Sequence, residues 1–349
     1  MVPSAHPSVV GVAMLTYLLR RVLLMIPTLI GMTLMLFVIV RFAPGIGKIS
    51  GADGSGNMAS DNARLEQEQS LQRHLGMIDE QGKPIPIPLQ YVSWAARVVQ
   101  GDLGRSMQYR KPVLELIFDR APITITLNII ATVLIYMIAI PGGMLSSVKR
   151  GRGFDFWWGL GTLALYSLPA MWVGSMLLGY LANPEYLGWF PSAGLQSTDT
   201  SRMTYWQVTL DYMHHLALPL MCMTYGGFAY LSKQMRASML DNIHQDWART
   251  ARAKGVPGYI VVTRDVFRNS LLPLITMAAG LIPGLLGGSV LIEKIFSIKG
   301  MGELAYQATL AKDLPLMQGL ALVGGVLTLI SYLIVDVCYS LADPRVSYD

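Results

Sequence analysis

Long uncharged runs of apolar residues alternate with short polar connections along most of the chain. A run of roughly 20 apolar residues can cross a bilayer core of about 30 Å as a helix. The fourth run is the weakest, because His214 and His215 lie near its start and Tyr225-Gly226-Gly227 interrupts its middle. The pattern predicts an all-α membrane protein with six transmembrane helices, at Val22–Val40, Ala121–Val148, Phe156–Ala182, Tyr212–Ser232, Asn269–Ile292 and Leu314–Val335.

The positions of Lys and Arg in the short connections predict the orientation of these helices. Arg20 and Arg21 precede the first helix, and seven Lys or Arg lie between Lys233 and Arg268, whereas only Arg202 lies between the third and fourth helices. Lys149, Arg150 and Arg152 fill the second connection. Lys294, Lys299 and Lys312 in the fifth connection oppose this arrangement, but acidic residues accompany them. We therefore expect both termini in the cytoplasm.

Composition supports the membrane assignment and excludes several other classes. Only 14% of residues are charged, against about 25% in an ordinary soluble domain, and 52% are hydrophobic. The net charge of +5 comes largely from predicted loops, so anionic lipid headgroups account for it and no nucleic-acid partner is predicted. Cys222 and Cys338 are far apart in apolar runs, which indicates neither a disulfide framework nor a zinc site. No A-x-A site follows the first run, so we expect it to remain as an anchor.

The segment between the first two predicted helices has a composition of its own. The glycine-rich stretch Pro44–Ser60 is typical of a flexible linker. Asp61–Leu75 predicts a surface helix, Lys83–Pro88 an extended brace, and Tyr91–Val98 a second short helix that ends at Gly101. We interpret these residues as a small external module that packs on the outer face. A role in handling substrate is the alternative.

Three features within or beside the apolar runs have both a structural and a functional interpretation. Gly280-x-x-x-Gly284, Gly284-x-x-x-Gly288 and the kink expected at Pro283 favour a helix-packing ridge over a gate. Asp336 lies near the cytoplasmic end of the last run, where a carboxylate can reach water or an arginine. Glu293 and Lys294, at the outer end of the fifth run, are expected to pair or to point into the interfacial layer.

Several motifs of catalysis and nucleotide binding are missing from the sequence. No G-x-x-x-x-G-K-[ST], G-x-S-x-G or H-E-x-x-H motif is present, and only the adjacent His214-His215 pair approaches metal-ligand spacing. The pair lies at a predicted membrane boundary, where polar residues are ordinary, so we expect no metal and no cofactor. Since no carboxylate lies near a predicted membrane midplane, an ion-coupled carrier or channel is the weaker alternative, and a membrane-embedded enzyme has less support still.

The most informative loop is Gln245–Gly255. Alanine and long straight-chain residues favour helix, and Arg252 and Lys254 near its end interact favourably with the helix dipole. Gly255 is suited to the left-handed conformation that caps a helix, and Pro257-Gly258 then predicts a turn. A small basic helix of this kind, between two spans, is a candidate contact with another protein. An ordinary basic loop is the alternative.

Short motifs recur over nearly all of the chain beyond residue 14. They are Leu18-Leu19-Arg20-Arg21, Ile26-Pro27-Thr28, Ala43-Pro44-Gly45, Gly101-Asp102-Leu103-Gly104-Arg105-Ser106, Pro122-Ile123-Thr124-Ile125-Thr126-Leu127, Thr250–Gly255, Phe267-Arg268-Asn269, Leu272-Pro273, Gly300-Met301-Gly302, Asp313-Leu314-Pro315 and Leu341–Arg345. Through them the chain resembles the permease subunits of ABC importers of the oligopeptide and dipeptide type and, among these, the Yej-type.

The resemblance implies a type I ABC importer permease fold in a bacterial inner membrane and transport by alternating access. It implies a coupling helix that docks on an ATPase subunit, formed here by Ala248, Arg249, Thr250, Ala251, Arg252, Ala253, Lys254 and Gly255. Trp247 replaces a glutamate of the family motif, and Asp265 replaces a basic or histidine residue. The implied partners are a second homologous permease, two ATP-binding subunits or one fused ATPase chain, a periplasmic peptide-binding protein and the bilayer.

The resulting domain plan has five parts. A tail (1–14), a first transmembrane helix (15–40) and a periplasmic module (41–120) precede an ABC transmembrane type-1 domain (121–340) with a coupling loop at 233–270, and a cytoplasmic tail (341–349) follows. The cargo implied by the resemblance is peptides or peptide-like compounds, carried through a pathway of which this chain forms half.

Overall fold

A computed structural model describes residues 7–42, 69, 72–73, 76–79, 81–197, 199, 201–271, 273–274, 277 and 289–342. These residues form helices, and the β pairing among them is limited to two isolated bridges, Ile78 with Pro84 and Arg105 with Pro112. The chain divides into two compact units. The first contains Met1–Asp119 and Gln307–Leu329, and the second contains Arg120–Tyr306 and Ile330–Asp349.

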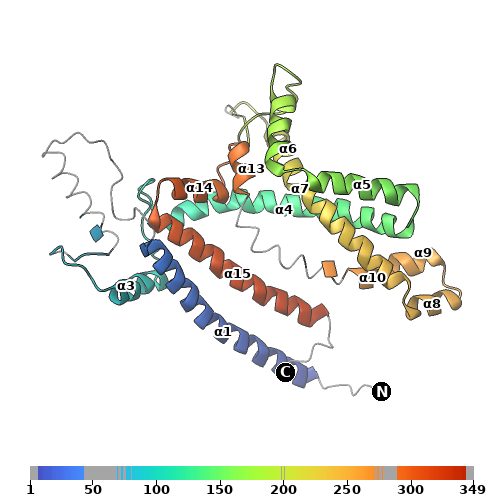
Figure 1. Cartoon of the computed structure of the whole chain (residues 1–349), viewed down its shortest axis with the longest axis horizontal. Coiled ribbons are helices and arrows are strands. Elements are labelled where there is room, and N and C mark those ends of the chain that lie inside the picture. Colours follow the sequence, from blue (N-terminus) through green and yellow to red (C-terminus); the bar gives the residue numbers. More distant parts are fainter. Residues whose placement is uncertain are drawn as a thin grey trace. The chain divides into compact units, whose positions relative to one another are not determined.

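Three long helices have the length and apolar composition of membrane spans (Figure 1). They are α1 (Pro7–Phe42), α4 (Val113–Val148) and α15 (Leu314–Ala342). They contain the first, second and sixth predicted spans. Helix α1 already begins at Pro7, inside the segment expected to be a tail. Pro27 in α1 and Pro141 in α4 lie inside continuous helix.

The third predicted span is broken into two helices rather than continuous. Helices α5 (Gly153–Ser167) and α6 (Ala170–Leu177) are bent by 91° at the break between them, and a π-helical turn, η1 (Leu178–Ala182), follows. Pro169 causes the break, because a proline disfavours helical conformation in the residue before it. Leu168 accordingly has an extended ψ of 129°. The bent pair together has the composition of a fourth span.

The glycines at the middle of the fourth predicted span do not interrupt it. Helix α7 (Tyr205–Ile243) is continuous through Gly226 and Gly227. A Cβ on Gly227 would lie 2.5 Å from a side-chain atom of Ile135, and one on Gly143 of α4 would lie 2.5 Å from the carbonyl oxygen of Ser232. Gly227 and Gly143 therefore allow α4 and α7 to approach closely, which explains why these two glycines stand inside helices.

Much of the fifth predicted span, including Gly280, Pro283, Gly284 and Gly288, lies outside the described residues. So do the predicted linker Pro44–Ser60 and most of the predicted helix Asp61–Leu75. The second short helix of the external module is confirmed as α3 (Ile87–Val99), and Gly101 beyond it has a positive φ of 81°. The predicted extended brace ends earlier than expected, because Ile87 and Pro88 form the first turn of α3. A proline is tolerated there, since a backbone N–H in the first turn has no partner within the helix.

Glu293 does not pair with Lys294 or point into an interfacial layer, contrary to the sequence-based expectation. Its side chain is 2% exposed. Its carboxylate accepts hydrogen bonds from the Thr124 hydroxyl at 3.0 Å and from the Glu303 amide at 2.8 Å. Thr124 Oγ1 in turn accepts from the Met301 amide at 2.8 Å. These bonds satisfy the free amides at the start of α14 (Met301–Leu310). Glu293 is therefore a buried helix cap.

A second buried carboxylate caps α15. Asp313 is 1% exposed and accepts hydrogen bonds from the Ser106 hydroxyl and from the Gln108 amide at 3.0 Å. It also accepts a longer bond of 3.3 Å from the Leu316 amide in the first turn of the helix. The loop after α3 is thus fixed to the start of α15. This contact joins two motifs, Gly101–Ser106 and Asp313-Leu314-Pro315, that lie far apart in the sequence.

Candidate functional site

The predicted helix in the loop after α7 is present as α8 (Asp246–Ala253) (Figure 1). Asp246 in its first turn and Arg252 in its last turn both suit the helix dipole. Ala248 is fully buried and Ala251 is half-buried, whereas Arg249, Thr250, Arg252, Ala253 and Lys254 are exposed. Since Ala248 and Ala251 are three residues apart, they lie on one face. The helix therefore packs through its small residues and presents its polar side to the outside.

Gly255 ends α8 as predicted. Its φ is +82°, and the Gly255 amide donates to the Arg252 carbonyl at 3.0 Å. The Val256 amide donates to the Ala251 carbonyl at 3.2 Å. This pair of bonds is the Schellman arrangement, which requires a left-handed residue at the position of Gly255. A Cβ on Gly255 would contact nothing within 4 Å, so conformation alone requires the glycine there.

The chain then reverses into a second helical segment. Pro257 precedes α9 (Gly258–Ile260), which continues through a π-helical turn, η2 (Val261–Val266), into α10 (Phe267–Ser270). Pro257 itself is extended, with a ψ of 134°. The turn itself lies at Lys254 and Gly255, and Gly258 is already the first residue of α9.

A small apolar core holds α8 against its neighbours. Ala248 shares this core with Met239 of α7 and with Val261 and Val266 of η2, all of them fully buried. The Arg252 guanidinium donates to the Ile243 carbonyl at 3.2 Å, which places a cation at the C-terminal end of α7. The position of α8 is thus set from both α7 and η2.

Two further contacts fix this support. The Ser238 hydroxyl of α7 donates to the Ser270 carbonyl at 3.0 Å, and the Ser270 hydroxyl donates back to the Ser238 carbonyl at 3.2 Å. Both serines are buried. Reciprocal bonds of this kind satisfy four polar groups at once. The pair therefore joins the C-terminal part of α7 to α10.

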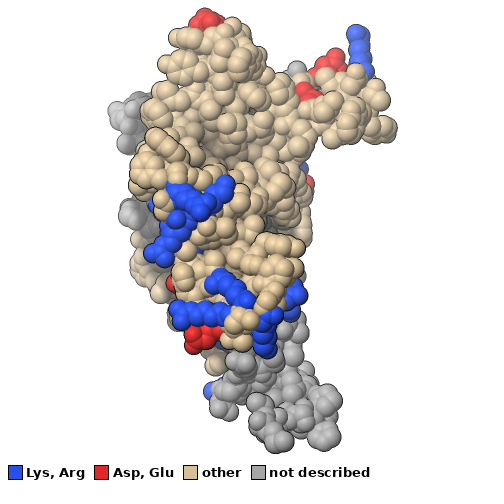
Figure 2. Space-filling model, turned by 90° about the vertical axis from the view of Figure 1, so that its right-hand side faces the viewer, with Lys and Arg blue, Asp and Glu red and all other residues tan. Residues whose placement is uncertain are grey.

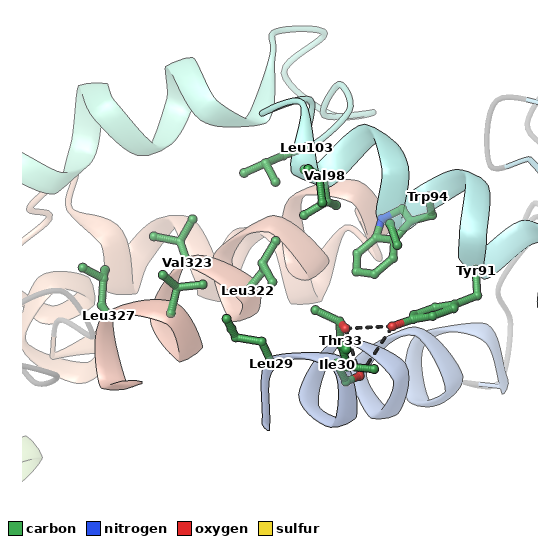
Figure 3. Close-up of a pocket in the computed structure, with 13 residues that line it drawn as sticks. Leu29, Ile30, Thr33, Tyr91, Trp94, Val98, Leu103, Leu322, Val323 and Leu327 are labelled. Carbon is green, nitrogen blue, oxygen red and sulfur yellow. Dashed lines mark hydrogen bonds between the residues drawn. The ribbon is translucent and has the colours of Figure 1, made fainter. Parts of the chain in front are cut away.

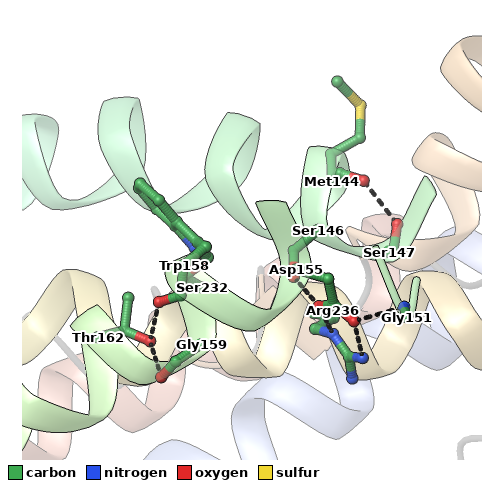
Figure 4. Close-up of polar contacts among 10 residues, drawn as sticks. All are labelled: Met144, Ser146, Ser147, Gly151, Asp155, Trp158, Gly159, Thr162, Ser232 and Arg236. Carbon is green, nitrogen blue, oxygen red and sulfur yellow. Dashed lines mark hydrogen bonds and ion pairs between the residues drawn. The ribbon is translucent and has the colours of Figure 1, made fainter. Parts of the chain in front are cut away.

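Arg236 joins α7 to α5. Its guanidinium forms two bonds of 2.7 Å with the Asp155 carboxylate, which also accepts bonds from the Ser146 hydroxyl and the Gly151 amide (Figure 4). Two parallel bonds of this type fix orientation as well as distance. One side of α7 is thus held to the turn between α4 and α5, and the other side carries Ser238.

The outward surface of this region is basic with two exposed aromatic residues. On the face shown in Figure 2, Lys and Arg gather in two groups, over the turn between α4 and α5 and over α8 to α10. Trp247 is 37% exposed and Tyr259 is 71% exposed. Exposed aromatic rings beside arginines are typical of the central residues of protein–protein contacts. No group of three or more metal-ligating side chains occurs within the described part of the chain.

The structure brings the eight predicted site residues together in α8 and its cap. It separates them by exposure, since Ala248 and Ala251 face inward while Arg249 and Lys254 face outward, and Arg252, although exposed, donates to the end of α7. Asp265, which departs from the family motif, forms a two-bond pair with the adjacent Arg264, and this contact lowers its pKa. Sequence reasoning missed Tyr259 and the Ser238–Ser270 pair. No pattern in the sequence distinguishes those serines from others, but Tyr259 directly follows a predicted turn.

The family to which the chain belongs is shown by comparison with known proteins. Residues 139–348 match the family described as "Binding-protein-dependent transport system inner membrane component". The chain belongs to this family. It is a multi-pass inner-membrane permease subunit of an ABC importer, and the hydrolysis of ATP takes place in partner subunits.

Individual relatives match almost the whole chain. The oligopeptide transport system permease protein AppB of Bacillus subtilis is 34% identical over 96% of this chain and 100% of its own length. The inner membrane ABC transporter permease protein YejB of Escherichia coli O157:H7 is 32% identical over 95% and 99%. Among solved structures, an inward-facing MetNI methionine ABC transporter covers 66% of this chain and 97% of its own, with 15% identity and a TM-score of 0.49.

Proposed function

We propose that α8 is the coupling helix through which this permease docks on an ATPase subunit. The observation that carries the proposal is the geometry of α8, which has a buried alanine face, a glycine-dependent cap and an exposed surface with Trp247 and arginines. An ion-coupled carrier has no use for such a segment. An ATP-driven permease needs one, because the energy source lies in another subunit.

The support beneath α8 accounts for how it would transmit force. Docking on the ATPase would move α8. The apolar core that Ala248 shares with Met239 and Val261, together with the hydrogen bonds between Ser238 and Ser270, would pass that movement to α7 and α10. ATP binds more tightly to one state of the ATPase pair than to the other, and this difference biases the permease between its inward-facing and outward-facing states. Site residues Ala248–Gly255 and the coupling loop 233–270 belong to this proposal.

Cargo, partners and orientation belong to the same proposal. Relatives named as oligopeptide transporters support peptides or peptide-like compounds as cargo. We propose a second homologous permease, two ATP-binding subunits or one fused ATPase chain, and a periplasmic peptide-binding protein as partners. The positive charge of the short loops supports cytoplasmic N- and C-termini and a periplasmic module between α1 and α4. The five-part domain plan, from the tail 1–14 to the tail 341–349, goes with this orientation.

The test compares the same substitution at two glycines of the loop. Gly255→Val places a β-branched residue at a φ of +82° and should abolish transport while the chain still inserts. Gly258→Val is the matched control, because Gly258 begins a helix and has open space around it. The measurement is peptide uptake and ATPase rate of the reconstituted complex. Normal uptake by an intact Gly255→Val complex would refute the coupling role.

A second experiment separates the proposal from the ion-coupled alternative. The permease without ATPase subunits is placed in liposomes under a proton or sodium gradient. We expect no accumulation of peptide. Accumulation under either gradient would favour a carrier and would overturn the proposed function.

A further inference from the structure

An apolar groove lies between α1, α3 and α15 in the first unit (Figure 3). Its volume is about 480 Å³. Helix α1 contributes Leu29 and Ile30, α3 contributes Trp94 and Val98, and α15 contributes Leu322, among other residues. A volume of this size is within the range of small-molecule sites, which is roughly 300–1,000 Å³.

The hydroxyl groups near the groove contact one another and the backbone. The Thr33 hydroxyl and the Tyr91 hydroxyl are 3.0 Å apart, and the Tyr91 hydroxyl also donates to the Ile30 carbonyl at 3.4 Å. No charged side chain lines the groove. A ligand that depends on polar recognition therefore has little to bind here, whereas a hydrocarbon chain fits the chemistry of the walls.

Two walls of the groove are membrane spans. The predicted spans within α1 and α15 are Val22–Val40 and Leu314–Val335, and the groove residues Ile30 and Leu322 lie toward their middles. Ile30 both lines the groove and is 54% exposed on the apolar surface of α1. The groove is thus continuous with the exposed apolar surface of α1.

Helix α3 packs against the part of α1 that is predicted to lie in the hydrocarbon. The Tyr91 and Trp94 rings contact the Phe37 ring of α1, with centroids 5.6 and 5.9 Å apart. Phe37 is six residues from Gly31, the middle of the predicted span Val22–Val40, so it lies at most about 9 Å from the centre of that span at a rise of about 1.5 Å per residue. The hydrocarbon extends about 15 Å from that centre.

Two apolar side chains on the outward side of α3 agree with this depth. Val92 is 60% exposed and Val99 is 87% exposed, although both are apolar. A short helix with exposed aliphatic residues and with Tyr and Trp on its other face is typical of a membrane interface.

We propose that α3 is embedded in one leaflet of the bilayer and that the groove binds an acyl chain of a membrane phospholipid. Under the orientation proposed above, this is the outer leaflet. The bound chain fills the space between the two spans and α3, and it makes a lipid part of the first unit. The site is separate from α8 and does not depend on the coupling role.

The test uses the assembled complex in nanodiscs of phosphatidylethanolamine and phosphatidylglycerol that contain a phospholipid with a photoreactive acyl chain. We expect the cross-linked lipid to be enriched on peptides of α3 and on α15 near Leu322. Val326 of α15 also lines the groove. Val326→Trp fills the groove and should lower this labelling about tenfold, because the ring excludes several methylenes. Val133→Trp is the control, since Val133 is 52% exposed on α4 outside the groove, and it should leave the labelling unchanged.

A second measurement does not require a groove-filling variant. Phospholipids brominated along the acyl chain should quench the fluorescence of Trp94, taken as the difference between the wild-type complex and Trp94→Phe. Three outcomes would overturn the proposal: labelling no stronger at the groove than at Val133, no quenching of Trp94, or cross-links from the groove to another polypeptide.

Discussion

Gly255 closes α8 and Gly300 precedes α14, so both glycines lie at a helix end, but their surroundings differ. Gly255 has a φ of +82° and open space around it. Gly300 has no such φ, yet a Cβ there would lie 2.5 Å from Thr124 Oγ1 and 2.6 Å from the Glu293 carboxyl carbon. One glycine is required for its conformation and the other for its size. A glycine in a motif therefore has to be assigned a physical reason before the effect of replacing it can be predicted.

The largest effect is expected at Gly300. Gly300→Ala would push the Glu293 carboxylate away from the start of α14 and disturb the hydrogen bonds that end there. We expect a loss of about 3 kcal/mol in the free energy of unfolding, from overpacking and from broken buried hydrogen bonds. Thermal unfolding of the purified complex in detergent measures it. An unchanged melting temperature would show that the glycine is not required for space.

Asparagine distinguishes the two glycines directly. Asn adopts the left-handed conformation more readily than other residues do, so Gly255→Asn should cost under about 1 kcal/mol and retain transport. Gly255→Ala should cost about 1–2 kcal/mol at the same position. At Gly300 the order reverses, because the larger Asn side chain has no room. Uptake assays and melting temperatures of the four variants test this. Equal damage from Asn at both positions would contradict the distinction.

The Glu293 cap should also make stability depend on pH. Burial raises the pKa of Glu293 above its ordinary value of 4.5, and this outweighs the hydrogen bonds from the Glu303 amide, the Thr124 hydroxyl and the Gly302 amide. The folded state therefore binds the proton more tightly than the unfolded state does. The resulting stabilisation is fully present below pH 4.5 and is lost as the pH rises through the raised pKa.

Comparison with Glu293→Gln isolates this contribution. The wild-type complex should gain stability relative to the variant as the pH falls from 7 towards 5, as measured by melting temperatures at each pH. The variant itself cannot titrate at this position. A difference between the two proteins that stays constant over this range would show that Glu293 keeps its ordinary pKa.

The sequence predicted the Gly255 region far better than the Gly300 region, and the reason is physical. Helix propensity, the dipole and a C-terminal glycine all act within a few residues, so α8 and its cap follow from Gln245–Gly255 alone. The burial of Glu293 depends on Thr124, which is 169 residues away. No local sequence pattern reveals that contact. A charged residue at the end of an apolar run instead predicted a side chain in the interfacial layer of the membrane.

The prolines also show that local sequence alone does not determine the structure. Pro141 and Pro219 lie inside continuous helices, whereas Pro169 separates α5 from α6. In an apolar span the backbone groups freed by a proline can be satisfied by neighbouring helices, so the residue alone does not determine whether the helix breaks. The three-dimensional packing decides, and the bend of 91° was therefore not predicted.

The smallest effect on stability is expected at Arg249 of α8, and comparison with Arg252 tests which side of the helix supports the loop. Arg249 is exposed and lies 3.8 Å from the exposed Asp246, so Arg249→Ala should change stability by less than about 0.5 kcal/mol. Arg252 donates to the last carbonyl of α7, so Arg252→Ala should cost about 1 kcal/mol.

Function should rank these two variants differently from stability if the outward face of α8 contacts the ATPase. Arg249→Ala should then weaken the affinity for the ATPase subunit and reduce its dependence on salt, because a solvent-exposed cation acts mainly through long-range attraction. Titration of the detergent-purified permease with the ATPase at two salt concentrations measures both quantities. If Arg249→Ala binds as the wild type does while Arg252→Ala fails, α8 supports the loop and the contact surface lies elsewhere, at Tyr259 or in the turn between α4 and α5.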